Sequence, residues 1–260
     1  MTDNESHKQV SIREHIKKRS MWAGAKEPQD MEFYVLNDFK NDDGSHEKVF
    51  NLETLRYSQV LYKIIDEIIA NAIDHYTNNK KTVDKISINL TKDGVISIYN
   101  NGPGIPIRLV KNLAGVEMYI PQLVFTEHLT GSNLDDEATK ERITGGQNGL
   151  GAKITVDFSK YFIIDTTDTD NKKHYSQTIT NGLDNIGIPV ITTLAKCNKE
   201  NKIAHTKITF LPDYAEFGLN INEFYPTLYK IIETRVWQTK AYTEINVLFN
   251  DNIIKLNNFA

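Results

Sequence analysis

An apolar stripe at helical spacing between Tyr57 and Tyr76 constrains the fold more than any other stretch of this sequence. That period predicts an amphipathic α-helix whose apolar face packs against a second layer. The members of the stripe are Val60, Ile64, Ile65, Ile68, Ile69 and Ala72. Soon after it, residues 85–90 and 95–100 alternate apolar and polar side chains around Thr-Lys-Asp-Gly. This alternation predicts a β-hairpin directly after the helix.

The remaining segments predict a mixture of strands and helices rather than a regular β–α alternation. Residues 37–48 form a polar turn region that is compatible with a hairpin, residues 119–129 contain a short helix, and residues 224–242 form a longer one. Strands are predicted at 161–168, 173–180, 205–212 and 244–251. This order favours an α+β fold, a two-layer sandwich in which a mixed, largely antiparallel sheet carries helices on one face.

Composition excludes several classes of protein. The chain has 260 residues, of which 40% are hydrophobic and 25% charged, which suits one large or two small globular domains. Its single cysteine, Cys197, excludes an internal disulfide and a cysteine-cluster metal site. No apolar run approaches the roughly 18 residues that a membrane span needs, and the polar start is no signal peptide. An intracellular protein without a membrane partner is therefore expected.

Three polar residues share one face of the predicted helix. Glu67, Asn71 and Asp74 stand at positions i, i+4 and i+7. A solvated helix face would explain any one of them. Together they offer a carboxylate that can act as a general base and an amide oxygen that can bind Mg²⁺ beside phosphates and water.

A glycine-rich stretch, Gly-Gly-Gln-Asn-Gly-Leu-Gly-Ala-Lys at 145–153, nearly matches the common phosphate-binding loop. Gly146 and Gly151 have the required spacing, but Ala152 precedes Lys153, and Ile154 replaces the hydroxyl that would bind magnesium. Such loops often merely turn the chain. If this one holds phosphates through its backbone amides and Lys153, Asn71 can supply the missing metal ligand.

Two shorter segments add polar groups. Residues 100–106, Asn-Asn-Gly-Pro-Gly-Ile-Pro, follow a predicted strand and read first as a turn. Their glycines would also allow a flat ligand to approach the backbone, with Asn101 able to donate and accept hydrogen bonds. Residues 129–133, Leu-Thr-Gly-Ser-Asn, offer hydroxyl and amide groups, which is a weak signal alone.

In this order and spacing, the segments resemble the Bergerat-fold (GHKL) ATPases. They are most similar to the ATPase domain of type IIA DNA topoisomerases of the eukaryotic and large-DNA-virus kind. The resemblance covers nearly the whole chain, through KIIDEIIANAIDH, NNGPGIP, YIPQLVF, LTGSN, TGGQNGLGAK and TKITFLPD. Six ordered matches are far more specific than one glycine-rich loop. ATP and Mg²⁺ are the cofactors that the resemblance implies.

The resemblance also implies roles for individual residues. Glu67 would activate the attacking water, Asn71 would bind Mg²⁺, and Asn101 would read the adenine. Thr206 would contact adenine through water, while Ile105 and Phe125 would line the base pocket, although core packing explains both almost as well. The other implied nucleotide-binding residues are Asp74, Ser132, Asn133, Gly146, Gln147, Asn148, Gly149, Leu150, Gly151, Ala152 and Lys153.

Two positions depart from the family pattern. Gln147 stands where the cellular eukaryotic loop usually has Arg, so a positive charge is lost. Gly131 stands where Ser is usual, so one hydroxyl contact is lost.

The implied function is an ATP-binding and ATP-hydrolysing module that drives DNA strand passage. ATP would pair two subunits into a clamp, and the full-length enzyme would act on duplex DNA in the nucleus, the cytoplasm or a viral replication site. Residues 1–20 would form an N-terminal arm and 21–260 the ATPase domain, with the transducer and DNA-cleavage domains outside this chain. Two alternatives remain: a module that binds ATP with negligible hydrolysis, and another GHKL ATPase of the chaperone or mismatch-repair type.

Overall fold

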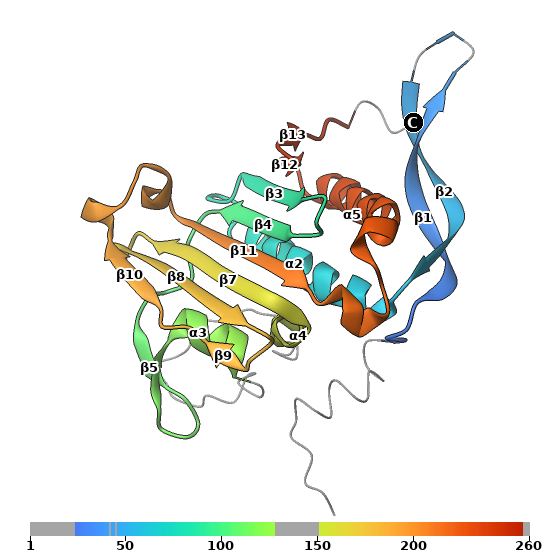
Figure 1. The fold of residues 1–260 in the computed structure, drawn as a ribbon. Coiled ribbons are helices and arrows are strands. Elements are labelled where there is room, and N and C mark those ends of the chain that lie inside the picture. The colour runs from blue at the N-terminus through green and yellow to red at the C-terminus, as the bar shows by residue number, and fades with distance from the viewer. Residues whose placement is uncertain (1–23, 42, 45, 128–150, 257–260) are drawn as a thin grey trace, which may run out of the picture.

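The apolar stripe forms helix α2, Gln59–Asn78, which lies against the main sheet (Figure 1). The computed structural model describes residues 24–41, 43–44, 46–127 and 151–256. Helix α2 begins after Ser58, whose Oγ accepts a hydrogen bond from Leu61 N at 3.2 Å and so caps the first turn. Tyr57, predicted as the start of the helix, belongs to the preceding strand instead.

The main sheet is mixed and largely antiparallel, as the sequence predicts. In the part of the chain that the structure describes, its strands run in the order β10-β8-β7-β11-β4-β3-β12-β13, with β9 beside β8. Among the strand pairs that the structure describes, only β3–β12 is parallel. The strands are β3 (Lys85–Leu90), β4 (Ile96–Asn101), β7 (Ser159–Asp168), β8 (Lys173–Thr180), β9 (Asn185–Ile186), β10 (Val190–Thr193), β11 (His205–Pro212), β12 (Asn246–Phe249) and β13 (Asn252–Ile253).

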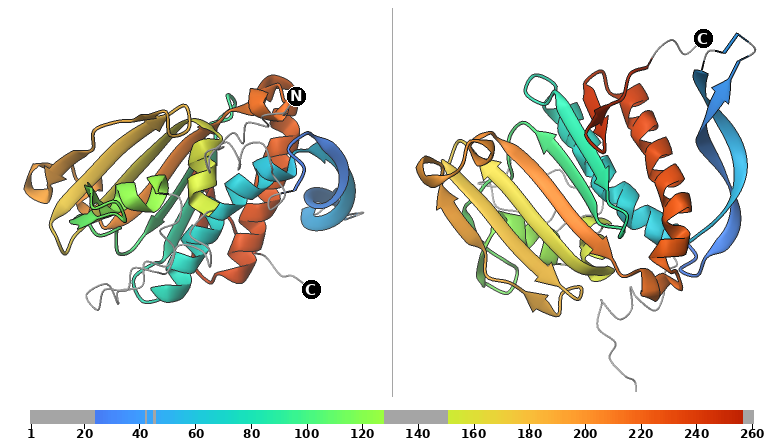
Figure 2. Two further views of the ribbon diagram at one scale, coloured as in Figure 1. Left: turned by 90° about the horizontal axis from the view of Figure 1, so that it is seen from below. Right: turned by 45° about the horizontal axis from the view of Figure 1, so that its top comes forward.

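The helices cover one face of this sheet (Figure 2). Besides α2 they are α3 (Ile120–Thr126), α4 (Gly151–Asp157) and α5 (Ile221–Tyr242). Short 3₁₀ turns lie at Leu194–Lys196, Glu200–Lys202 and Tyr214–Phe217. The predicted two-layer α+β sandwich with helices on one face is confirmed, because both the sheet order and the position of the helices match it.

The two faces of the sheet differ in character because side chains alternate along each strand. On β4, the buried residues Ile96, Ile98 and Asn100 alternate with the partly exposed residues Ser97, Tyr99 and Asn101. The register places Ile96 beside Phe210 and Phe210 beside Phe162, so an apolar row crosses β4, β11 and β7 under the helices. The core of the domain therefore lies between the sheet and α2.

A long hairpin, β1 (Gln29–Lys40) and β2 (His46–Tyr57), forms a separate two-stranded sheet beside α5 (Figure 1). Buried Thr234 of α5 accepts a hydrogen bond from Leu36 N at 3.0 Å. The sequence analysis expects a polar turn at 37–48, but residues 37–40 and 46–48 belong to the two strands of this hairpin. Packing on α5 stabilises these extended residues, and such tertiary packing leaves no local signal. A second small hairpin joins β5 (Leu109–Lys111) to β6 (Glu117–Tyr119).

Candidate functional site

The polar face of α2 is directed toward the start of α4. The Glu67 carboxylate uses its two oxygens differently. Lys63 Nζ lies 2.5 Å from Oε1, one turn earlier on the same helix. The Oε2 atom faces Gly151, where a Cβ atom would lie only 1.9 Å from it. The bare Cα of Gly151 therefore allows α4 to approach the Glu67 carboxylate.

Helix α4 is held on α2 by a buried hydrogen bond. Thr155 Oγ1 donates to the carbonyl oxygen of Ile64 at 2.8 Å, and Thr155 is fully buried. The described part of this helix is Gly151–Asp157, which includes the last three residues of the glycine-rich stretch. The end of the glycine-rich segment and the polar face of α2 are thus fixed together.

Charged groups of both signs gather at this junction. Lys153 is only 2% exposed. Burial lowers the pKa of its ammonium group, and the negative charge of Glu127 partly opposes that shift. Burial raises the pKa of Asp74, and the nearby charge of Glu67 raises it further. Glu67 and Asp74 thus concentrate negative charge on α2, while α4 carries a buried ammonium that is influenced by Glu127.

A polar row crosses three strands at the end of the helix-covered face. Thr206 on β11 lies between Asn100 on β4 and Thr166 on β7 in the strand register. Asn100 is 5% exposed and Thr166 fully buried. The Oγ1 atoms of Thr166 and Thr206 lie 3.2 Å apart. The neighbouring row on this face, Ile98, Ile208 and Ile164, is apolar. The row with Asn100 and Thr206 therefore lies at the edge of the apolar core and offers polar groups to a ligand.

The loop after β4 is attached to the same row. Ile105 N donates to Thr166 Oγ1 at 3.0 Å, and Ile107 N donates to Asp168 Oδ2 at 2.8 Å. A Cβ atom on Gly104 would lie 2.0 Å from the carbonyl oxygen of Thr167, so only glycine fits there. Gly104 therefore lets the loop approach the backbone of β7, while the approach of a flat ligand to residues 100–106 stays a prediction.

Asn101 lies on the opposite face of the sheet, away from the helices and the polar row. Its Oδ1 accepts hydrogen bonds from Asp84 N at 3.1 Å and Lys85 N at 3.0 Å, and its Nδ2 donates to Asp84 Oδ1 at 2.6 Å. The structure therefore gives Asn101 a role in fixing the start of β3. It is the neighbouring Asn100 that points to the helix-covered side.

The other predicted residues differ in how far the structure places them. Ile105 and Ala152 are partly buried against the core, while Phe125 is 4% exposed and packs on Phe162 with ring centroids 5.2 Å apart. Asn71 lies one helical turn after Glu67 and is partly exposed. Seven predicted residues lie outside the described part of the chain: Ser132, Asn133, Gly146, Gln147, Asn148, Gly149 and Leu150.

Sequence reasoning missed Asn100 and Thr166. The alternation along residues 95–100 contained the signal for Asn100, because it stands two residues after Ile98 and so shares its face. Thr166 had no comparable signal. Its position depends on the register between β7 and β11, which are far apart in the sequence.

Comparisons of the sequence with known proteins identify its family. The family of histidine kinase-, DNA gyrase B- and HSP90-like ATPases matches residues 57–188. DNA topoisomerase 2 of Penicillium chrysogenum is 34% identical over 98% of this chain, which covers 15% of that protein. DNA topoisomerase 2 of Acanthamoeba polyphaga mimivirus is 33% identical over 98% of this chain, which covers 19% of that protein. The chain thus spans less than a fifth of these curated relatives.

Solved structures show the same similarity. The ATPase region of Saccharomyces cerevisiae topoisomerase II has a TM-score of 0.77 and 29% identity, and the match covers 99% of this chain and 64% of that one. The ATPase and transducer domains of DNA topoisomerase II from Balamuthia mandrillaris also have a TM-score of 0.77, with 28% identity over 98% of this chain and 62% of that one.

In the described ranges, no helix is both long and apolar enough to cross a membrane.

Proposed function

The chain belongs to the family of histidine kinase-, DNA gyrase B- and HSP90-like ATPases, and on that premise we propose that it is the ATP-binding and ATP-hydrolysing part of a type II DNA topoisomerase. Its fold is that of the topoisomerase II ATPase region. One observation carries the assignment of the reaction. The Glu67 carboxylate faces Gly151, at the point where the glycine-rich segment enters α4.

In the proposed reaction, Glu67 acts as the general base. A water oxygen attacks the γ-phosphorus, the bond from that phosphorus to the β–γ bridging oxygen breaks, and Glu67 Oε2 accepts the proton from the water. Lys63 holds Oε1 and so orients the carboxylate. Lys153, in the first turn of α4, would add positive charge beside the phosphates. Catalysis of phosphoryl transfer depends mainly on such positioning and charge neutralisation.

The donor groups on α2 fit a magnesium ion. Asn71 offers an amide oxygen one turn after Glu67, and the carboxylate of Asp74 lies within the influence of the Glu67 charge. Oxygen ligands beside concentrated negative charge suit this hard cation. Mg²⁺ held there by Asn71 would supply charge neutralisation for the phosphate oxygens.

We assign recognition of the adenine to Asn100 in place of Asn101. Asn100, Thr206 and Thr166 share one row on the helix-covered face, whereas the side-chain oxygen and nitrogen of Asn101 bond to Asp84 and Lys85 on the other face. Ile105 stands beside this row through its hydrogen bond to Thr166. An amide can accept from the exocyclic amine of adenine and donate to a ring nitrogen.

The wider activity is proposed by analogy with the relatives. Residues 21–260 would form the ATPase domain and residues 1–20 an arm. ATP binding would pair two subunits into a clamp, and the complete enzyme would pass one duplex DNA through another inside the cell. The similarity over 98% of the chain to proteins named DNA topoisomerase 2 supports this proposal over a chaperone or mismatch-repair role.

Calorimetric binding and phosphate release by the same chain test the proposal. Wild type should bind a non-hydrolysable ATP analogue in the presence of Mg²⁺, and Asn71→Ala should remove the magnesium dependence. Glu67→Gln should keep binding and lose hydrolysis. Binding without phosphate release by wild type would refute the hydrolytic assignment for this chain. A failure to bind any adenine nucleotide would refute the site itself.

A further inference from the structure

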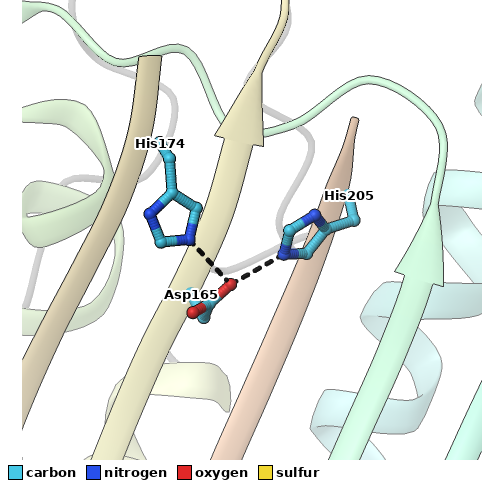
Figure 3. Close-up of side chains that lie close together, drawn as sticks. All are labelled: Asp165, His174 and His205. Atoms are coloured by element: carbon cyan, nitrogen blue, oxygen red, sulfur yellow. Dashed lines mark hydrogen bonds and ion pairs between the residues drawn. The ribbon is translucent and has the colours of Figure 1, made fainter. Parts of the chain in front are cut away.

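Three metal-ligating side chains converge on the sheet face opposite the helices (Figure 3). They are Asp165 on β7 and two histidines on the strands that flank it, His174 on β8 and His205 on β11. Asp165 Oδ1 lies 3.2 Å from His174 Nε2 and 2.7 Å from His205 Nε2. Both imidazoles therefore point at one carboxylate oxygen, and all three ligand atoms lie within 4.8 Å of one another.

The hydrogen bonding of His205 indicates that a cation belongs between these groups. His205 Nδ1 lies 2.8 Å from the carbonyl oxygen of Ile203, and because a carbonyl can only accept, this nitrogen carries a hydrogen. A neutral His205 would then direct its Nε2 lone pair at the negatively charged Asp165 oxygen. That arrangement is repulsive unless a proton or a metal ion lies between them.

Burial limits how these three groups can share charge. The side chains of His174 and His205 are 9% and 6% exposed. One proton on His205 would balance the charge of Asp165, and a neutral His174 could donate its Nε2 hydrogen to the same oxygen. A divalent ion would replace both of these hydrogens and bind the two neutral imidazoles and the carboxylate. Asp165 is 27% exposed, which leaves room for water as a further ligand.

The spacing of the ligand atoms suits tetrahedral coordination after a small adjustment. Zinc bonds of about 2.0 to 2.2 Å to nitrogen and oxygen separate neighbouring ligand atoms by about 3.3 Å in a tetrahedron. Of the two contacts to Asp165 Oδ1, the one to His174 at 3.2 Å is close to that value, and the one to His205 at 2.7 Å would lengthen by about half an ångström. A site with two imidazoles and one carboxylate binds Zn²⁺ and similar transition-metal ions more tightly than the harder ions Mg²⁺ and Ca²⁺.

We propose that Asp165, His174 and His205 bind one divalent transition-metal ion, with Zn²⁺ as the preferred ion. The Ile203 carbonyl would orient His205 as outer-shell acceptors orient other metal-bound histidines. Tyr99 stacks on the same ring at a centroid distance of 5.5 Å. The ion would join β8, β7 and β11, and so would fix the strands whose opposite face carries Thr166 and Thr206.

Metal titration of the untagged, metal-free chain tests this site without any nucleotide. Calorimetry with Zn²⁺ should give one tight site per chain, binding should raise the melting temperature, and Co²⁺ should give the visible absorption of a low-coordinate site. Asp165→Asn and His205→Gln each remove a direct ligand, so each should weaken Zn²⁺ binding by more than the roughly tenfold that loss of an outer-shell partner costs. The conservative His174→Gln should do the same.

Two control variants separate this site from other zinc ligands. Cys197→Ser removes the single thiol, and Asp251→Asn removes an exposed carboxylate in the turn between β12 and β13; both should retain wild-type Zn²⁺ binding. Circular dichroism identifies the ligand variants that remain folded. The proposal is overturned if wild type binds no Zn²⁺, or if folded Asp165→Asn and His205→Gln bind it as wild type does. Either result would show that this cluster is not a Zn²⁺ site.

Discussion

The Cα atom of Gly151 lies so close to the Glu67 carboxylate that a Cβ atom there would come within 1.9 Å of Oε2. This contact joins two segments more than 80 residues apart in the sequence, the middle of α2 and the first residue of α4. The atom that a new methyl group would meet is the far end of a flexible side chain. The carboxylate can therefore rotate away, and the fold can survive the substitution.

Gly151→Ala should consequently reduce hydrolysis far more than it reduces nucleotide binding or stability. A displacement of about 1 Å in a catalytic group can cost about 100-fold in rate, and we expect a loss of that order in phosphate release. The measurement is a double-mutant cycle with Glu67→Gln. Because the effect acts through Glu67, Gly151→Ala should cause little further loss once Glu67 is replaced. An equal loss in both backgrounds would contradict this explanation.

Lys63→Met should lower the rate of phosphate release while leaving nucleotide affinity nearly unchanged. Lys63 contacts Oε1 of Glu67, and without it the carboxylate can adopt other rotamers. Both side chains are partly exposed, so little effect on the melting temperature is expected. Lys63→Arg should restore most of the rate, since it keeps a cation at this position. Lys81→Met, on an exposed turn after α2, is the matched control.

Asn100→Ala should affect nucleotide binding, whereas Asn101→Ala should affect stability. The first should weaken adenine-nucleotide binding, because Asn100 lies in the polar row with Thr206 and Thr166. The second should lower the free energy of unfolding by about 1 to 3 kcal/mol, because three hydrogen bonds to Asp84 and Lys85 are lost. Nucleotide titration of the folded proteins and denaturant melts measure the two effects. If only Asn101→Ala lost affinity, Asn101 and not Asn100 would be the residue that contacts adenine.

Nucleotide affinity should fall at alkaline pH through Lys153. Burial lowers the pKa of this ammonium from its usual 10.5. As pH rises through the lowered pKa, the positive charge disappears and the attraction for phosphates weakens. The affinity difference between wild type and Lys153→Met should therefore be largest near neutral pH and shrink as pH rises. Binding titrations between neutral and alkaline pH check this, and a constant difference would exclude Lys153 as the responsible group.

Raising the pH should increase the contribution of Lys153 to the free energy of unfolding, although it weakens nucleotide binding. Between the lowered pKa and 10.5 the unfolded chain binds more protons at Lys153 than the folded chain does. The contribution of this group to the free energy of unfolding therefore rises with pH in that window. Melts of wild type and Lys153→Met across the same pH series should show this difference in slope, and parallel slopes would contradict it.

Local patterns in the sequence determined much of the fold. The apolar stripe of α2, the alternation in β3 and β4, and the strands at β7, β8 and β11 each follow from the period of neighbouring residues, because side-chain direction repeats every 3.6 or 2.0 residues. The same helical period placed Glu67, Asn71 and Asp74 on one face. The order and spacing of the motifs further indicated the family to which the chain belongs.

Only the tertiary structure decided which distant groups meet. The register of β4, β11 and β7 aligned Asn100, Thr206 and Thr166 in one row. The alternation within β4 could place Asn100 on the face of Ile98, but a strand's own pattern does not say which residues of the neighbouring strands lie opposite it. The approach of Gly151 to Glu67 and the convergence of Asp165, His174 and His205 likewise depend on packing between elements far apart in the chain. Such contacts have no local period to reveal them.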